Sequence, residues 1–295
     1  MTPQPASRAR GIVLMLCTGL LWSTAGVVTR HIDRASGAEI TFWRSAFCAL
    51  AMVVIVTILH RGEAAARLLR IGRAGALSGA MWAVMFTCFM LALTRTSTAN
   101  TLIITSLSPL AAALFGWLLL GERLAARTWA ATGLALAGIA IMFGGDLHAG
   151  GARMTGNLIA LLVPVAAGLN FALLRSARTR VDLIPAVLVG GAVSAAAMLP
   201  LALPLRASAQ DLALLALLGA FQLAAPCALA VVAARHISAA EAALIGLSEN
   251  VFGPFWAWLG AGEVPSRNAM LGGAVVLAAL IAQVSARPRR VARRA

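Results

Sequence analysis

The chain has 295 residues, of which 61% are hydrophobic and only 12% carry a charged side chain. Soluble domains usually have about a quarter of their residues charged, so this composition excludes a soluble enzyme, a disordered protein and a small disulfide-rich module. The formal net charge is +14, and all 24 basic residues are arginine. A nucleic-acid partner would require a soluble basic face, and we expect no such partner here.

Long apolar runs divide the chain into ten stretches, each long enough to cross a bilayer as a helix. In chain order they cover residues 11–30, 38–59, 74–94, 97–119, 128–145, 156–175, 183–203, 211–233, 239–260 and 268–286. The apolar runs are continuous rather than alternating, which excludes a membrane barrel of strands. We therefore predict an all-α polytopic membrane protein, with short tails at residues 1–10 and 287–295 and no soluble domain.

The arginines indicate how these spans are oriented, because the cytoplasmic loops of membrane proteins carry an excess of basic residues. If residues 1–10 are cytoplasmic, 17 of the 24 arginines fall in cytoplasmic segments and the other seven do not. We therefore expect a multi-pass protein of a bacterial inner membrane with both termini in the cytoplasm. The expected partners are the lipid bilayer, a small-molecule substrate and protons, with the chain a monomer or a weak oligomer.

The cysteines, histidines and sequence motifs do not indicate an enzyme. Cys17, Cys48, Cys88 and Cys227 lie in four different spans, and the four histidines are scattered over span ends and loops. The sequence contains no HExxH, GxSxG or phosphate-binding P-loop motif. We expect no enzymatic activity, no metal ion and no cofactor, and we expect that ATP is not the direct source of energy.

The two halves of the chain resemble each other. A shift of 141 residues places Gly121-Glu122 on Gly262-Glu263, and the whole comparison predicts that residues 11–145 are repeated as 156–286. Each half has five spans, an odd number, so the halves must have opposite orientations in the membrane. Inverted repeats of this kind are typical of secondary transporters, which bind their substrate near the midplane between the repeats. A duplicated structural bundle without a transport role is the alternative.

Three segments carry a resemblance to a known family. The run from Ser108-Pro109 to Gly121-Glu122, together with Leu21-Trp22-Ser23 and Phe42-Trp43-Arg44, resembles the EamA-type drug/metabolite transporter family. The resemblance covers nearly the whole chain and rests on the order of the motifs, the ten spans and the duplication together. It implies a ten-helix inverted-repeat fold and a protein that exports small metabolites, amino acids among them, or toxic compounds. An exchanger of nucleotide sugars or phosphate esters within the same superfamily is the rival, and a polytopic membrane enzyme or a membrane scaffold would be a different class.

Glu249, near the middle of the ninth predicted span, is the most informative single residue. A charged acid at mid-bilayer costs about 2.5–3.5 kcal/mol on insertion scales, so we expect it to face the bundle interior or a wet cavity. The shift of 141 residues aligns it with Ser108, which places a polar group at the same point of both repeats. We expect Glu249 to bind a proton or a substrate ammonium group. A neutral, hydrogen-bonded acid or a structural pair with an arginine is the alternative.

Other polar, aromatic and methionine side chains in the spans are candidates for the lining of a substrate cavity. Hydroxyls at i, i+4 and i+7 of the fourth span would share one helix face, and methionine or aromatic side chains suit varied or cationic ligands. For the hydroxyls and amides, a bond to a neighbouring helix is an equal alternative, and for any single aromatic or methionine side chain a packing or lipid-facing role is the preferred one. The substrate-binding candidates are Trp22, Trp82, Met85, Thr101, Thr105, Ser108, Asn170, Gln222, Ser248, Glu249, Asn250 and Phe252.

Three charged residues near span ends are interpreted as gate or loop-setting groups. Arg44 could contact a substrate carboxylate or pair with Glu39 or Asp33, and the structural pairing is the preferred interpretation. Glu122 and Glu263 end the fourth and ninth spans, where latching a gate or setting a loop fits them better than substrate contact. The sequence leaves open the identity of the substrate and the choice between proton antiport and facilitated efflux.

Overall fold

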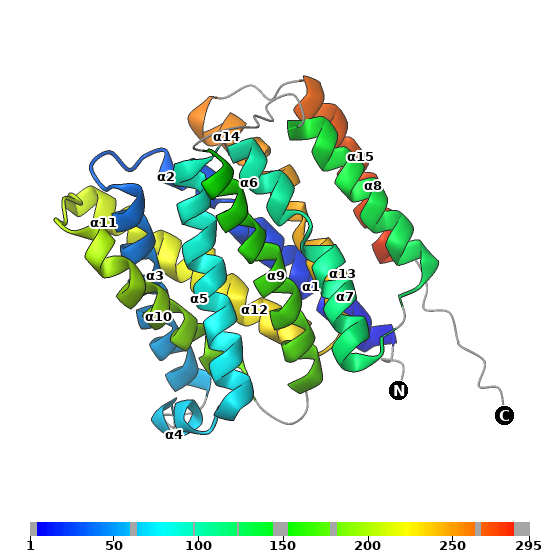
Figure 1. The fold of residues 1–295 in the computed structure, drawn as a ribbon, viewed down its shortest axis with the longest axis horizontal. Coiled ribbons are helices and arrows are strands. Elements are labelled where there is room, and N and C mark those ends of the chain that lie inside the picture. Colours follow the sequence, from blue (N-terminus) through cyan, green and yellow to red (C-terminus); the bar gives the residue numbers. More distant parts are fainter. Residues whose placement is uncertain are drawn as a thin grey trace.

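The computed structural model describes residues 5–59, 64–96, 98–122, 124–143, 153–177, 182–262 and 267–285, and within these ranges it contains helices and no strands (Figure 1). The first half comprises α1 (Pro5–Trp22), α2 (Ala25–Thr29), α3 (Gly37–Leu59), α4 (Ala64–Leu69), α5 (Gly72–Arg95), α6 (Thr98–Thr105), α7 (Ser108–Leu120) and α8 (Ala126–Phe143). The second half comprises α9 (Arg153–Ala177), α10 (Ile184–Ala202), α11 (Ala209–Leu217), the π-helical segment η2 (Leu218–Ala224), α12 (Ala225–Ala233), α13 (Ala239–Gly246), α14 (Ser248–Ala261) and α15 (Arg267–Ser285).

These helices reproduce the predicted order of spans. Among the described residues, seven segments are long and apolar enough to cross a membrane, and the apolar parts of α8 and α15 are two shorter ones. α13 and α14 together occupy the ninth predicted span. The chain is therefore a polytopic all-α membrane protein, as the composition indicates. α4, in the connection between the second and third spans, was not predicted.

The sequence predicts unbroken spans, but the fourth and ninth are each divided near their middle. α6 ends at Thr105 and α7 begins at Ser108, whereas α13 ends at Gly246 and α14 begins at Ser248. Both breaks contain tight bonds from one residue to the third before it, for example from Leu107 N to Ile104 O and from Leu247 N to Leu244 O. The two breaks lie 141 residues apart to within one residue, so they are a property of the repeat.

Glycines with left-handed backbone geometry end the corresponding helices in the two halves. Gly121 follows α7 with φ 63°, and Gly262 follows α14 with φ 69°. A positive φ at this position costs glycine little because it has no Cβ, and it terminates the helix. The aligned Gly-Glu pairs in the sequence therefore mark the same structural event in both repeats.

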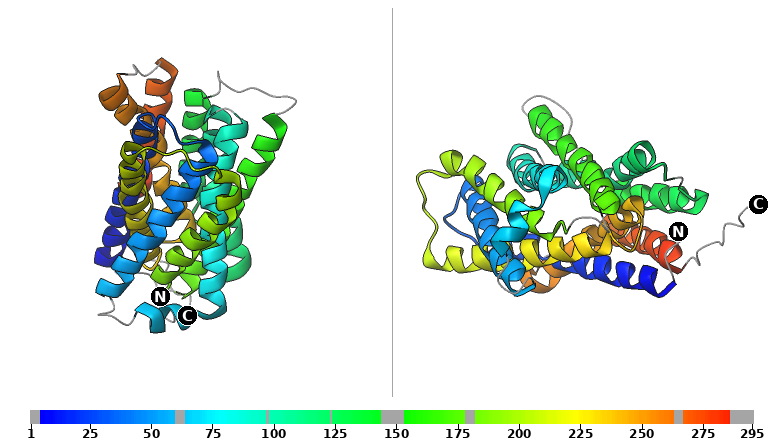
Figure 2. Two further views of the ribbon diagram at one scale, coloured as in Figure 1. Left: turned by 90° about the vertical axis from the view of Figure 1, so that its left-hand side faces the viewer. Right: turned by 90° about the horizontal axis from the view of Figure 1, so that it is seen from below.

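Corresponding helices of the two halves make equivalent contacts, as expected for two repeats related by an approximate two-fold axis in the membrane plane. α5 packs against α9, and its counterpart α12 packs against α1. α5 also contacts α10, just as η2 contacts α3. α3 and α10, which are counterparts, pack against each other, and so do α8 and α15. Figure 2 shows these helices as one bundle from two further directions.

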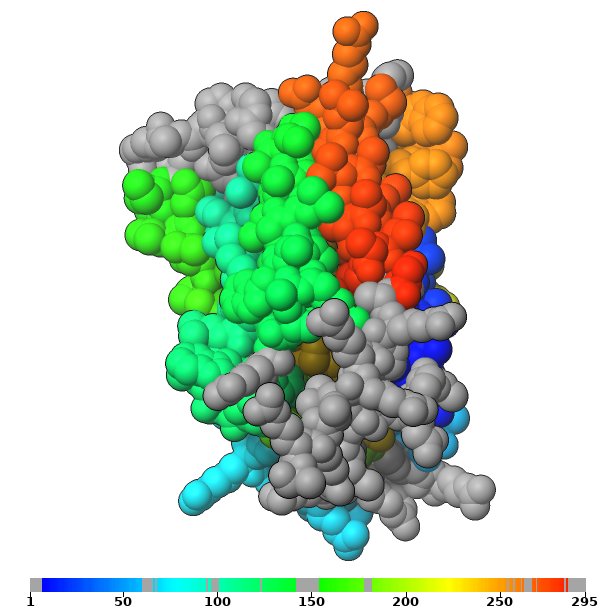
Figure 3. All heavy atoms as spheres, turned by 90° about the vertical axis from the view of Figure 1, so that its right-hand side faces the viewer, coloured from blue at the N-terminus to red at the C-terminus, as the bar shows by residue number. Residues whose placement is uncertain are grey.

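α8 and α15 lie side by side along one edge of the bundle, where Figure 3 shows them on the surface. Their backbones approach closely: a Cβ built on Gly138 would lie 2.7 Å from the carbonyl oxygen of Gly272. Ile139 and Val276 belong to a small apolar cluster that is separate from the main core. This edge pair therefore closes the bundle on one side and packs against Leu244 of α13 and Leu247 just after it.

Candidate functional site

A cavity in the helical bundle is lined by residues of both repeats. It contains about 820 Å³ of space between atoms, a value that includes open solvent at its mouth. The first repeat contributes Met15, Trp22, Arg44, Trp82, Met85, Phe86, Phe89, Thr105 and Ser108, and the second contributes Val163, Ala167, Phe171, Gln222, Leu223, Ala243, Gly246, Leu247, Glu249 and Asn250.

Part of the cavity lining comes from the middle of the apolar spans. Glu249 is ten residues after the first residue of α13 and twelve before the last of α14. Thr105 and Ser108 flank the break between α6 and α7. The two helix breaks of the repeat therefore lie at the cavity.

Most of the candidate residues meet in this cavity. Eight of the twelve substrate-binding candidates line it, namely Trp22, Trp82, Met85, Thr105, Ser108, Gln222, Glu249 and Asn250. They come from six helical segments, α1, α5, α6, α7, η2 and α14, and are brought together by the packing of the two repeats. Contact between these residues and a substrate stays a prediction.

The other four candidates, Thr101, Asn170, Ser248 and Phe252, are not part of the lining. Asn170 Oδ1 accepts a hydrogen bond of 2.7 Å from Ser78 Oγ, which joins α9 to α5. Ser248 is buried against α1, where a Cβ on Gly19 would overlap its hydroxyl. For Asn170 the geometry matches the helix-bridging alternative rather than the cavity.

Pro109 cannot donate to the carbonyl of Thr105, four residues earlier, because proline has no N–H. The hydroxyl of Ser108 donates to that carbonyl instead. The hydroxyl of Thr105 in turn donates to Leu102 O at 3.2 Å. Both hydroxyls therefore stabilise the helix break while their side chains line the cavity.

Arg44 lies in the cavity wall, seven residues after the first residue of α3 and thus about 10 Å along that helix. Its side chain is buried, with the residue only 3% exposed. Nη1 lies 3.5 Å from Oε1 of Gln222, at the limit of a hydrogen bond, and Nε has no hydrogen-bond partner. A buried guanidinium with so few partners is costly, because it has lost water without gaining a compensating anion.

The preferred interpretation paired Arg44 with Glu39 or Asp33, and the described part of the chain contains no such ion pair. The carboxylate of Glu39 instead accepts hydrogen bonds from the backbone N–H groups of Arg206 and Ala207, at 2.8–3.0 Å. Those three bonds hold the start of α3 to the segment that precedes α11. Glu39 is occupied in this way, and the other interpretation of Arg44, contact with a substrate carboxylate, stays a prediction.

Glu249 is the acidic group of the cavity lining. Its alternative structural roles required a hydrogen-bond partner for a neutral acid or a partner arginine, and the described residues give it neither a hydrogen bond nor an ion pair. The cavity thus combines one basic and one acidic side chain, both unpaired, within largely apolar walls.

Among the described residues, three ion pairs tie together the end of the bundle where α1 begins. Arg8 contacts Glu241 at 2.7 Å, Arg235 contacts Asp182 at 2.7 Å, and Arg175 Nε lies 3.1 Å from Glu122 Oε1. A bond of 3.4 Å from Arg175 to the carbonyl of Arg235 links two of these pairs. Glu122 thus bridges to the second repeat, and its proposed latching role has a partner, whereas Glu263 lies outside the described residues.

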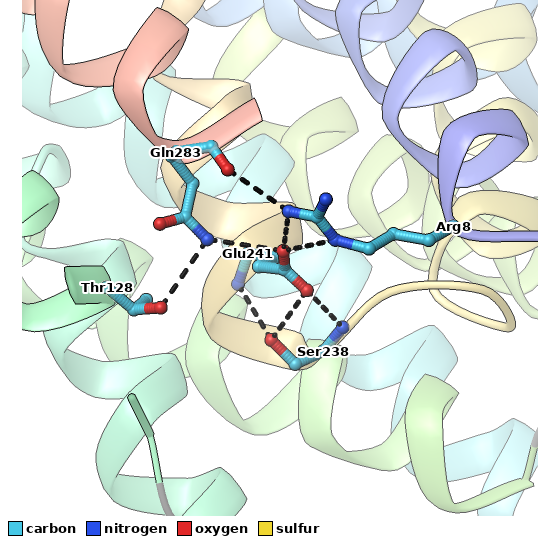
Figure 4. Close-up of polar contacts among 5 residues, drawn as sticks. All are labelled: Arg8, Thr128, Ser238, Glu241 and Gln283. Carbon is cyan, nitrogen blue, oxygen red and sulfur yellow. Dashed lines mark hydrogen bonds and ion pairs between the residues drawn. The ribbon is translucent and has the colours of Figure 1, made fainter. Parts of the chain in front are cut away.

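The Arg8–Glu241 pair belongs to a larger network, drawn in Figure 4. Arg8 also donates to the backbone carbonyl of Gln283, whose side-chain amide reaches both Glu241 and Thr128. Glu241 in addition caps α13 through a reciprocal arrangement with Ser238. The network therefore joins the first turns of α1, α8 and α13 to the last turn of α15.

Two inverted repeats of membrane helices around a cavity lined by both of them are the arrangement of a membrane transporter. The chain belongs to the EamA-like transporter family, whose model matches residues 9–144 and 154–284. It is thus a transporter of the drug/metabolite superfamily, as its resemblance to the EamA type indicates.

A solved protein structure superimposes on this chain with a TM-score of 0.79 at 17% sequence identity, over 93% of this chain and 97% of the other. At that identity the match shows the fold alone. No curated protein matches the chain.

Part of the cavity wall was not predicted. Val163, Ala167 and Phe171 of α9 line it at i, i+4 and i+8, which is one helix face. The spacing is visible in the sequence, but three apolar residues on one helix face suit a cavity, a neighbouring helix or lipid equally well, so periodicity does not distinguish these surroundings.

Proposed function

We propose that the protein exports small amphipathic metabolites, amino acids or related compounds, by alternating access through the cavity between its repeats. The observation that carries this proposal is the coexistence of unpaired Arg44 and Glu249 in one apolar-walled cavity. An amino acid offers a carboxylate, an ammonium group and an apolar side chain, and each finds a matching surface there. The start of α1 would lie in the cytoplasm of a bacterium, as the arginine distribution favours.

Exchange of phosphate esters or nucleotide sugars is the second candidate, and buried Arg44 is the observation that favours it. Guanidinium groups bind phosphate well because they offer several donors in a fixed plane. The same cavity, however, contains a carboxyl group that would repel a phosphate once ionised. One arginine opposed by one acid therefore suits a molecule without net charge better than a polyanion.

Glu249 is also the proposed proton site. A proton and a substrate ammonium group would compete for the same carboxylate, which is a sufficient basis for exchanging one for the other across the membrane. The intact network at the α1 end would close that end while the cavity is accessible from the opposite one.

The experiment is counterflow in liposomes that contain the purified full-length chain. Vesicles preloaded with unlabelled amino acids should accumulate the labelled amino acid above the level of empty vesicles, and vesicles preloaded with phosphate esters should not. Uptake of none of the amino acids in the panel would refute the amino-acid proposal. For proton coupling, Glu249→Gln should abolish pH-dependent transport, and normal transport by this variant at every pH would exclude the proton role.

A further inference from the structure

We infer that Arg44 and Glu249 are the two poles of one binding site, with Arg44 taking the carboxylate and Glu249 the ammonium group of a single zwitterionic substrate. This inference rests on the proposed function, since amino acids are the substrates proposed there. It adds which repeat recognises which end of the substrate.

The pole in the first repeat consists of hydrogen-bond donors that lack acceptors. Nε of Arg44, on α3, and Nε1 of Trp82, on α5, are both buried and have no hydrogen-bond partner. Trp82 is 1% exposed, so the protein excludes water from its indole N–H. A buried donor without an acceptor is unfavourable, and two of them in the lining of one cavity indicate that an anionic group of the ligand completes them.

The pole in the second repeat consists of acceptors that lack donors. Glu249 and Asn250 are consecutive residues in the first turn of α14, and both line the cavity. The Asn250 amide nitrogen donates to Ser106 Oγ at 3.3 Å, which fixes the side chain, and Oδ1 is buried without a partner. An ammonium group has three donors and no acceptor, so it matches this pair of oxygens.

Charge balance favours a zwitterion over an ion of either sign. A simple anion would compensate Arg44 but would be repelled by Glu249, and a simple amine would leave the guanidinium uncompensated. Only a molecule with both charges compensates both Arg44 and Glu249. The aromatic side chains of Trp22, Phe86 and Phe171 then provide an apolar surface for its side chain.

The two poles lie on different repeats, so substrate binding can affect how the repeats are placed relative to each other. The donors come from α3 and α5 of the first repeat, and the acceptors come from α14 of the second. A bound zwitterion would therefore bridge the two repeats, whereas an analogue that lacks one charge would hold only one of them. Binding of the complete substrate is in this way coupled to the relative position of the repeats.

The test measures binding of three ligands to the purified full-length chain by calorimetry. The probes are L-phenylalanine, its methyl ester, which lacks the carboxylate charge, and its N-acetyl derivative, which lacks the ammonium charge; L-leucine and L-methionine extend the panel. The unmodified protein should bind the zwitterion on the order of 10-fold to 100-fold more tightly than either analogue. Equal affinity for all three probes, or binding of none of the amino acids, would overturn the inference.

Two variants assign the poles. Arg44→Gln should bind phenylalanine and its methyl ester with equal affinity while it still discriminates against the N-acetyl derivative. Glu249→Gln should show the opposite pattern, and Arg44→Lys, which keeps the positive charge, should restore part of the discrimination against the ester. If each variant weakens all three ligands by the same factor, the residues are structural and the inference is wrong.

Arg10→Gln is the matched control, because Arg10 is exposed at the start of α1 and is not part of the cavity lining. It should retain the binding pattern of the unmodified protein. Counterflow separates this inference from the proposed function: transport of amino acids with no discrimination between the charged ends would refute the two poles and leave the function intact. Absence of amino-acid transport would refute the function itself.

Discussion

Arg44 and Gln222 meet across the boundary between the two repeats, with Nη1 of the arginine 3.5 Å from Oε1 of the glutamine. The amide nitrogen of Gln222 donates to the backbone carbonyl of Trp22 at 3.2 Å, which orients its oxygen toward the guanidinium. Gln222 lies in the π-helical segment η2, four residues before Pro226. Because proline has no N–H, the regular helical pattern cannot continue there, and the wider turn places the amide in the cavity wall.

This relationship predicts the effect of charge at position 222. Gln222→Glu should give Arg44 a permanent anionic partner, which would compete with the substrate carboxylate. We expect its affinity for L-phenylalanine to fall on the order of 10-fold, because a charge-assisted bond is stronger than the neutral one it replaces. Calorimetric titration of the variant measures this change.

Gln222→Leu is the matched control for the same site. It removes the weak bond to Arg44 without adding a charge, so its affinity should fall less than that of Gln222→Glu. If the glutamate variant binds phenylalanine as tightly as the unmodified protein, Arg44 does not contact the carboxylate.

The class of fold and much of the candidate site follow from the sequence for a physical reason. In a membrane protein, apolar run length determines the spans, and a polar residue within a span is rare enough to stand out. Glu249 and Gln222 were found in this way, and both line the cavity. Polar residues that only bridge helices give the same signal, so Asn170 was predicted as a lining residue although it bonds to Ser78.

Arg44 shows what the sequence could not provide. Its nearest acids along the chain, Glu39 and Asp33, made a local ion pair the simplest interpretation. The competition for Glu39 comes from backbone N–H groups near residue 206, more than 160 residues away, and this contact exists only once α3 and α10 have packed together. The break between α13 and α14 was missed for a different reason: the tight turn at Leu247 is formed without a proline at the break itself.

The network around Arg8 predicts a local change in stability. Arg8→Gln should remove the ion pair and leave the Glu241 carboxylate without its cationic partner, at a cost of about 1–3 kcal/mol for a largely buried pair. Amide hydrogens in the first turns of α13 should then exchange faster, since Glu241 also caps that helix. Hydrogen exchange followed by mass spectrometry would detect this change.

Arg10→Gln again provides the control, because it removes the same charge two residues away on an exposed part of α1. It should leave exchange in α13 unchanged. Equal acceleration of exchange in both variants would mean that α13 is stabilised by the total positive charge near the start of α1 and not by the Arg8–Glu241 contact.

His236, between α12 and α13, predicts a pH dependence of stability. Burial lowers the pKa of its imidazole from the ordinary value of 6.5, and Arg10, Arg235 and Arg175 lower the pKa further. The folded protein therefore favours the neutral ring, whose Nδ1 lies 2.8 Å from Ser7 Oγ. The contribution to stability is fully present above the ordinary pKa and is lost as the pH falls toward the lower pKa of the folded state, because the unfolded chain takes up the proton first.

Thermal unfolding in detergent at pH 7.5 and pH 5.5 tests this sign. The unmodified protein should lose stability on acidification, and His236→Gln should lose less over the same interval. A variant with the same pH dependence as the unmodified protein would show that His236 is not the responsible group.

Gly168 lies where the backbones of α9 and α7 are in close contact, so a larger residue there should be destabilising. A Cβ at this position would lie 2.5 Å from the carbonyl carbon of Ala111 and 2.7 Å from the nitrogen of Ala112, and backbone atoms cannot move aside as a side chain can. Gly168→Ala should therefore destabilise the fold by about 1–3 kcal/mol, despite the better helix propensity of alanine. Gly133→Ala on α8 is the control, because nothing lies within 4 Å of a Cβ built there, and it should melt at or above the temperature of the unmodified protein.

Because Gly168 directly follows Ala167 of the cavity wall, Gly168→Ala should also weaken phenylalanine binding. Equal melting temperatures for the Gly168→Ala and Gly133→Ala variants would show that α9 and α7 have room to separate.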